Sequence, residues 1–156
     1  MKLLFKQRFF SWFDSYDVFD EFGNVVFTVK GQLSWGHRLN IYNSAGVHVG
    51  TVKEVVFTWL PKFELYEGSR LVDVLKKKFL FFKNSYALDS LGWNVDGDFM
   101  GWDYSILDSR GIVVARVNKV IFKFNDTYEI DVVNPANALY ALMFTLAIDA
   151  EKCSKN

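Results

Sequence analysis

The C-terminal stretch ANALYALMFTLAIDAEK, residues 136–152, decides the fold of this chain. Asn134 and Pro135 precede it, and these residue types favour the N-cap and the first turn of a helix. The apolar side chains cover every direction of a helical wheel instead of one stripe: Leu139, Tyr140, Leu142, Met143, Phe144, Leu146 and Ile148. A helix that is apolar on all sides must be buried on all sides, in a protein core or in a membrane.

The length of this helix favours a protein core. Its apolar tract, residues 136–150, has about 15 residues, whereas a helix needs ~20 residues to span a bilayer. The sequence therefore predicts a central helix and no transmembrane segment. The rest of the chain must supply the material that surrounds it.

That material has the pattern of β-strands joined by short turns. Turn residues with a glycine occur at residues 21–24, 43–46 and 108–111. Segments rich in β-branched and aromatic residues are typical of strands, and they span residues 16–20, 25–33, 39–42, 47–57, 63–66 and 112–124. Short strands at this spacing predict a sandwich or a barrel.

An internal repeat organises the strands. Residues 39–65 align without a gap on residues 104–130, with identity at 8 of the 27 positions. The sequence thus predicts one domain, residues 1–156, built from two copies of a β unit. We place the first copy at about residues 15–67, the second at about 85–133 and the helix at about 136–150.

The composition excludes several classes of protein. Of the 156 residues, 51% are hydrophobic and 18% aromatic, and 18 basic residues balance 18 acidic ones. This hydrophobicity excludes intrinsic disorder, and zero net charge argues against a surface built for nucleic acid. The single cysteine, Cys153, allows no internal disulfide, and the N-terminus lacks the apolar stretch of a signal peptide. We expect a cytoplasmic protein.

Four segments together resemble the LURP-one-related family, in particular its bacterial branch. They are FKQRFFSWFDSYDVFDEFGNVVFTVKG at residues 5–31, SWGHRLNI at 34–41, VLKKKF at 74–79 and WNVDGDFMGWDYSI at 93–106. The resemblance covers nearly the whole chain and implies the tubby C-terminal-like fold, a mainly β, closed, twelve-stranded antiparallel barrel around its last helix. Tubby proteins and phospholipid scramblases share this fold, so the resemblance implies lipid head-group binding or membrane tethering.

Barrel geometry agrees with this expectation. About eight strands is the limit at which inward side chains fill a barrel by themselves, so a wider barrel needs a helix as its plug. A plugged barrel has no room for an internal ligand. We therefore expect the function on the outer wall, a rim or a loop.

The strongest charged feature is the run Lys76, Lys77 and Lys78, followed by Lys83. One reading is an anion site for a lipid phosphate, to which Arg8 adds charge if the N-terminal strand lies nearby. The other is a set of lysines that protects a sheet edge beside core phenylalanines. Side chains alternate along a strand, so three successive lysines on one strand cannot all face water.

Other candidate sites are weaker. His37 and His48 lack further metal ligands or a nucleophile, and the acids at residues 96, 98 and 103 lack the rest of a calcium loop. Among the five tryptophans, Trp35 and Trp59 lie near turns and are the best candidates for exposure, whereas Trp93 aligns with a core position of the first copy. No residue set indicates a cofactor, a metal or an enzyme.

The sequence supports two functional hypotheses. The first is a non-enzymatic binding module that associates with anionic phospholipid head groups at a membrane surface. The alternative is a protein-interaction or regulatory scaffold, with a link to nucleic acid left open. The lysine cluster favours the first, because a local positive patch is compatible with zero net charge.

Overall fold

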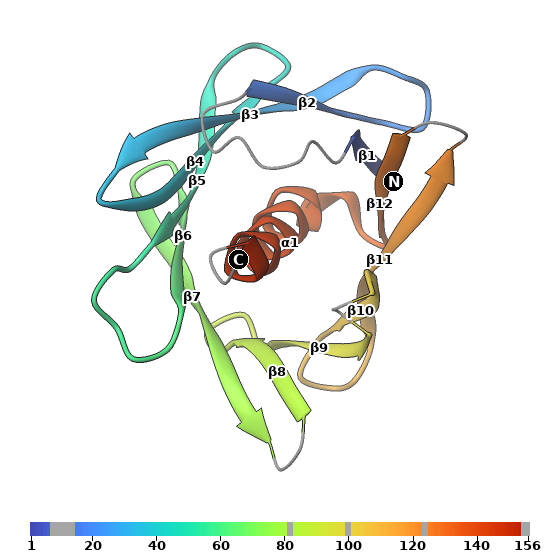
Figure 1. Cartoon of the computed structure of the whole chain (residues 1–156). Coiled ribbons are helices and arrows are strands. Elements are labelled where there is room, and N and C mark those ends of the chain that lie inside the picture. The colour runs from blue at the N-terminus through green and yellow to red at the C-terminus, as the bar shows by residue number, and fades with distance from the viewer. Residues whose placement is uncertain (7–14, 81–82, 99–100, 123–124, 154–156) are drawn as a thin grey trace.

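The computed structural model describes residues 1–6, 15–80, 83–98, 101–122 and 125–153. It is a closed antiparallel barrel of twelve strands with one α-helix along its interior (Figure 1). The fold class predicted from the sequence is confirmed. No helix of the described ranges has the length and apolar character needed to cross a bilayer.

The elements follow one another with short connections. The strands are β1 (Lys2–Lys6), β2 (Ser15–Phe19), β3 (Val25–Ser34), β4 (Gly36–Asn43), β5 (His48–Glu54), β6 (Lys62–Glu67), β7 (Arg70–Leu80), β8 (Lys83–Leu88), β9 (Trp93–Asp98), β10 (Asp103–Leu107), β11 (Val113–Phe122) and β12 (Asn125–Val132). A 3₁₀ turn (Pro135–Asn137) leads into α1 (Ala138–Cys153).

Pairing between the first strand, β1, and the last strand, β12, closes the barrel. β1 pairs along its length with β12, from Lys2 opposite Asp131 to Lys6 opposite Thr127, and it meets β2 at Leu4 opposite Phe19. Every other strand pairs with its neighbours in the chain. Closure removes the unpaired strand edges that would otherwise template aggregation.

The helix fills the barrel as its sequence predicts. Asn134 caps the 3₁₀ turn that leads into it by accepting a hydrogen bond from the Ala136 amide at 3.1 Å. Side chains on all sides of the helix are fully buried, among them Leu142, Phe144 and Ile148. At Gly50 of β5 a side chain would lie only 3.1 Å from Leu139, so glycine allows the helix to approach the wall closely.

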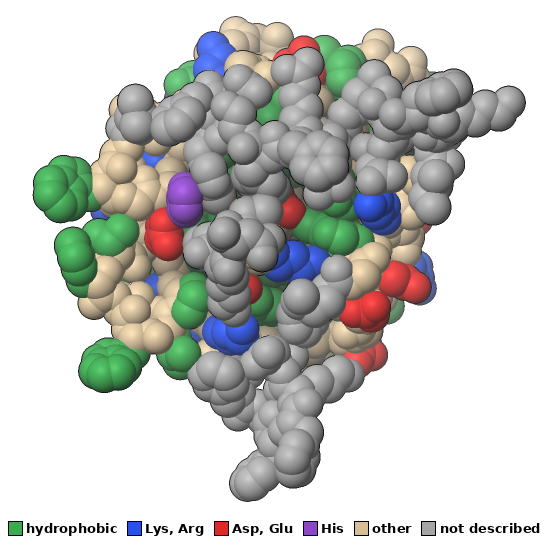
Figure 2. Space-filling model, viewed as in Figure 1, with side chains coloured by type: hydrophobic (Ala, Val, Ile, Leu, Met, Phe, Trp, Pro, Cys, Tyr) green, Lys and Arg blue, Asp and Glu red, His purple; other side chains and the backbone are tan. Residues whose placement is uncertain are grey.

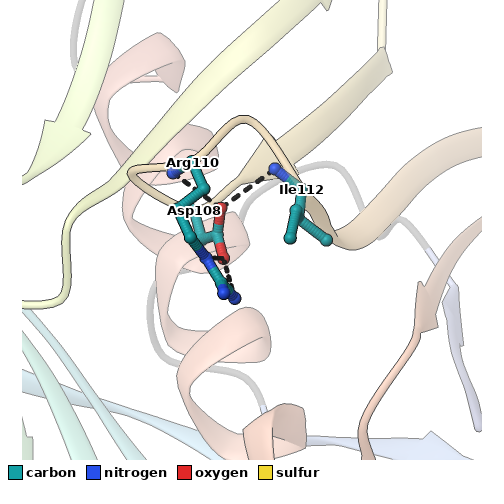
Figure 3. A network of polar contacts seen from close by, with 3 residues as sticks. All are labelled: Asp108, Arg110 and Ile112. Carbon is teal, nitrogen blue, oxygen red and sulfur yellow. Dashed lines mark hydrogen bonds and ion pairs between the residues drawn. The ribbon is translucent and has the colours of Figure 1, made fainter.

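Three hairpin turns share one hydrogen-bonding pattern, and Figure 3 shows the turn that begins at Asp108. The side chain of Asp108 accepts from the amides of Arg110 and Ile112, both at 2.9 Å. Asn43 and Asp20 accept from the amides two and four positions later in the same way. A glycine in the left-handed region follows three positions after each, with φ of 79°, 76° and 84°. The first turn begins at Asp20, one residue before the predicted start.

The two aligned sequence segments, 39–65 and 104–130, are 65 residues apart, and strands of the two copies show the same separation. Adding 65 to the residue numbers of β4, β5 and β6 gives 101–108, 113–119 and 127–132, which overlap β10, β11 and β12. Sequence and strand positions therefore share one period. The duplication of a β unit stays our proposal for how this chain is built.

The predicted strand at residues 47–57 extends too far. β5 ends at Glu54, and residues 55–61 form a connection to β6. Phe57 has a φ of 62°, in the left-handed region that bulky residues rarely adopt. Its apolar neighbours gave the segment the composition of a strand, and composition does not reveal this backbone conformation.

Replacing Leu142 with Asp is expected to unfold the protein. The side chain is fully buried, and an unpaired charge there costs at least several kcal/mol. Leu71, which is 48% exposed on β7, offers a matched control, because Leu71→Asp places the same charge in water. Circular dichroism during thermal unfolding distinguishes the two variants. A Leu142→Asp protein as stable as the control would place the helix outside the barrel.

Candidate functional site

The pleat of β7 separates the predicted lysines. Lys76 lies on the outer face, where its ammonium pairs with Asp89 at 3.3 Å. Lys77 faces the helix and pairs with Glu151 at 3.2 Å, with 6% and 2% of the two side chains exposed. The side chains of Lys78 and Lys83 and the whole of Arg8 lie outside the described residues. The structure therefore assigns neighbouring lysines to different environments.

The inner lysine belongs to a buried polar cluster at the C-terminal end of α1. Glu151 also accepts a hydrogen bond from the Tyr86 hydroxyl, and the Lys77 ammonium lies 5.9 Å from the centre of the Tyr86 ring. Burial and the bond to Glu151 raise the pKa of Tyr86 above its ordinary range, so its hydroxyl keeps its proton. Lys77 thus joins the barrel wall to its plug.

A second acid of the helix end has an altered protonation equilibrium. Asp149 is partly buried, and burial raises the pKa of its carboxyl to about 7, against the opposing effect of Lys152. The ammonium of Lys152 lies over the Trp102 ring, 3.8 Å from its centre. This end of the helix therefore holds ionisable side chains whose burial the sequence pattern does not reveal.

The outer wall carries a strip of cations across four neighbouring strands, β4 to β7. Arg38 lies directly opposite Lys53, and Lys62 lies directly opposite Lys76. We call these four residues the basic strip. Like charges at directly opposite positions destabilise a sheet. One cation of each pair also has an acidic partner: Glu64 lies 3.6 Å from Lys53, and Asp89 lies 3.3 Å from Lys76. The other cation of each pair, Arg38 or Lys62, still faces a like charge across the strands.

Two loops at one end of this wall expose large apolar side chains. Trp35 in the β3–β4 turn is 85% exposed, and in the β5–β6 loop Phe57 is 90% exposed and Trp59 fully exposed at 103%. We call these three residues the aromatic tip. Apolar side chains project from the left edge of the molecule in Figure 2, on the side where Figure 1 places β4 to β6.

Two residues of the basic strip lie close in sequence to the aromatic tip. Lys62 opens β6 directly after the β5–β6 loop, and Arg38 lies three residues after Trp35. Trp35 and Trp59, which the sequence singled out only as the best candidates for exposure, are both exposed, and the expected burial of Trp93 is confirmed at 6% exposed. Phe57 was missed, because the sequence around it is typical of a strand.

The remaining candidates form ordinary local contacts. His37 pairs with Glu54 at 3.6 Å, and burial lowers its pKa while Glu54 opposes that effect. His48 lies 2.9 Å from the Thr51 hydroxyl, and Asp98 accepts from the Gly101 amide at 2.9 Å. Within the described ranges, no group of three or more His, Cys, Asp or Glu side chains is placed to hold a metal ion.

A family model, a bacterial protein and a plant protein structure each match most of this chain. The LURP-one-related family model matches residues 1–149. The uncharacterised protein YxjI of Bacillus subtilis (strain 168) is 24% identical over 150 residues, covering 96% of this chain and 92% of that protein. The X-ray structure of Arabidopsis thaliana protein AT5G01750 superposes with a TM-score of 0.66 at 16% identity, covering 95% of this chain and 89% of that one. The latter likeness concerns the fold.

Removing the charge of Lys77 or Glu151 is expected to destabilise the protein in a coupled way. Lys77→Met removes the cation that pairs with the buried Glu151 carboxylate, and Glu151→Gln removes the anion that pairs with the buried Lys77 ammonium. Breaking a buried pair in this way costs about 3–5 kcal/mol. The double variant removes both charges and should lose less than the sum of the two. Urea unfolding of the four proteins measures the coupling, and additive losses would contradict the pairing.

Asp149 is expected to make the folded state less stable as pH rises. The unfolded carboxyl has a pKa of about 3.9 and the folded one about 7, so the folded state binds the extra proton between these values. Stability should therefore fall from about pH 4 to pH 7, by up to about 1.4 kcal/mol per pH unit. Asp149→Asn should flatten this slope in urea unfolding at pH 5 and pH 8. An unchanged slope would show that Asp149 ionises normally.

Proposed function

Because this chain belongs to the LURP-one-related family, we propose that it is a non-enzymatic binding module that associates with anionic phospholipid head groups at a membrane surface. The tubby-like barrel is compatible with a binding role. The observation that carries the lipid proposal is the basic strip, whose like-charged pairs an anionic surface would relieve.

The packed interior supports a surface role. The helix occupies the centre of the barrel, where Leu142, Met143 and Phe144 have no exposed surface. A ligand must then bind to the outer wall or to the loops. Cations near an anionic leaflet contribute about 1 kcal/mol each, so a strip of four supplies a useful affinity without a deep pocket.

The structure changes the composition of the proposed site. Lys77 pairs with Glu151 inside the barrel, so we assign it to the connection between wall and helix. Lys76 stays in the site and gains Arg38, Lys53 and Lys62 from the neighbouring strands. Lys78, Lys83 and Arg8 remain part of the proposal from the sequence alone.

Reversing charges of the strip is expected to weaken vesicle binding. In sedimentation assays, the protein should bind vesicles of phosphatidylcholine and phosphatidylserine better than vesicles of phosphatidylcholine alone, and salt should weaken this binding. Lys62→Glu with Lys76→Glu should reduce the binding constant for these vesicles at least ~10-fold, since about 1.4 kcal/mol corresponds to a factor of ten.

A matched control lies on the β10–β11 hairpin. Arg110 and Arg116 are exposed there, and reversing both makes the same change in net charge away from the strip. This control should bind as the unchanged protein does. Equal binding to neutral and anionic vesicles would refute the lipid proposal and favour the protein-interaction scaffold.

A further inference from the structure

We propose that the aromatic tip, Trp35, Phe57 and Trp59, inserts into the interfacial layer of an anionic bilayer while the basic strip contacts the head groups. This inference rests on the proposed function and adds to it the surface and the orientation of docking. The occupant is a phospholipid surface. Four observations carry it: the exposure of the tip, its construction, its charge environment and its shape.

The tip contains the two tryptophans that the structure describes as exposed. The other two tryptophans with described burial, Trp93 and Trp102, are 6% and 8% exposed and belong to the core. The core of this protein therefore accommodates tryptophan side chains, and Trp35 and Trp59 are not part of it. Single exposed apolar residues are common on soluble proteins, but a cluster of large ones marks an interaction surface.

The tip is built by specific contacts between its two loops. The His37 amide donates to the Glu54 carboxylate at 2.9 Å, which joins the start of β4 to the end of β5. At Gly36 a side chain would lie 2.6 Å from Val56, so only glycine lets the loops approach this closely. The amide of Val55 donates to the carbonyl of Lys62 at 2.9 Å and closes the base of the β5–β6 loop.

Phe57 adds a cost that folding alone does not explain. Its φ of 62° lies in the left-handed region, which costs about 1–2 kcal/mol for a residue with a side chain. Its ring is 90% exposed, so burial in the protein does not offset this cost. Glycine or asparagine would suit the backbone better. Strain combined with exposure indicates a functional position.

The charges around the tip select an anionic partner. Lys62 follows the β5–β6 loop directly, and Lys53 and Arg38 lie on the adjoining strands. Two carboxylates in this area, Glu54 and Glu64, lie close to His37 and Lys53. Tryptophan rings favour the level of the lipid head groups, and nearby cations favour anionic lipids. Aromatic rings beyond a row of cations thus match the layered chemistry of an anionic bilayer, with apolar chains beneath negative head groups.

The shape of the tip favours a bilayer over a protein surface. Apolar side chains at this edge of the molecule project separately from the surface in Figure 2. Aromatic residues that bind proteins usually fill pockets near the centre of a well-packed interface. Separately projecting rings instead suit a fluid layer, which adapts its own shape to each ring.

The test replaces the tip and measures both binding and depth. Trp35→Ser, Phe57→Ser and Trp59→Ser together should reduce sedimentation with phosphatidylserine-containing vesicles at least ~10-fold. The matched control replaces three exposed apolar residues at the other end of the barrel, Phe22, Ile112 and Val133, which are 83%, 52% and 60% exposed. This control should bind like the unchanged protein, and both variants should unfold at its temperature.

Depth is read from tryptophan fluorescence with brominated phosphatidylcholine in the same vesicles. The unchanged protein should be quenched and its emission shifted to the blue, and the triple serine variant should lose both effects. Trp35→Phe and Trp59→Phe should each remove part of the quenching and keep most of the binding, because phenylalanine still inserts.

The outcomes separate this inference from the proposed function. If the unchanged protein binds anionic vesicles and the triple serine variant binds equally without quenching, the tip does not insert and the head-group proposal stands. If the unchanged protein binds no vesicles, both fail. If it binds none and a protein partner is retained by the unchanged chain and lost with the serine variant, the tip is a protein interface instead.

Discussion

Enclosure of the C-terminal helix is the constraint on which the rest of the structure depends. Leu142, Phe144 and Ile148 point in different directions around α1 and all are fully buried, so the helix needs a wall on every side. An open sheet covers one side only. A closed barrel covers all of them, and twelve strands make it wide enough to hold a helix. The helix therefore needs the closed wall to bury its side chains, and the wall needs the helix to fill its interior.

The same enclosure creates a problem at the C-terminal end of the helix, where polar residues enter the interior. Lys77 and Tyr86 from the wall both contact Glu151 there. A buried charge without partners would be strongly destabilising, so the cluster makes the end of α1 compatible with burial. It also fixes which wall the helix end faces. One lysine of the run is used for this purpose, and its neighbour Lys76 is left for the outer surface.

The sequence was sufficient for features that depend on local pattern. The all-round apolar helix and the turns at Asn43 and Asp108 follow from composition and spacing, whereas the sequence identified Trp35 and Trp59 only as candidates for exposure. Features that depend on which strands lie side by side were not predictable. Arg38 opposite Lys53 is a consequence of register, and Glu151 meets Lys77 across 74 residues of chain. The exposure of Phe57 was not predicted, because a left-handed backbone conformation cannot be recognised in a run of apolar residues.

A plugged barrel divides stability and binding between different parts of one small domain. The interior is filled by the helix, so binding is left to the outer wall and the loops. Like-charged cross-strand pairs occur on the wall from β4 to β7, and the strained Phe57 lies in the β5–β6 loop of that wall. Each is unfavourable for the isolated chain, and in the proposed docking its cost would be offset by contacts with an anionic, partly apolar layer. These three unfavourable features share one wall with the exposed tryptophans Trp35 and Trp59. The proposed docking surface would account for all of them together.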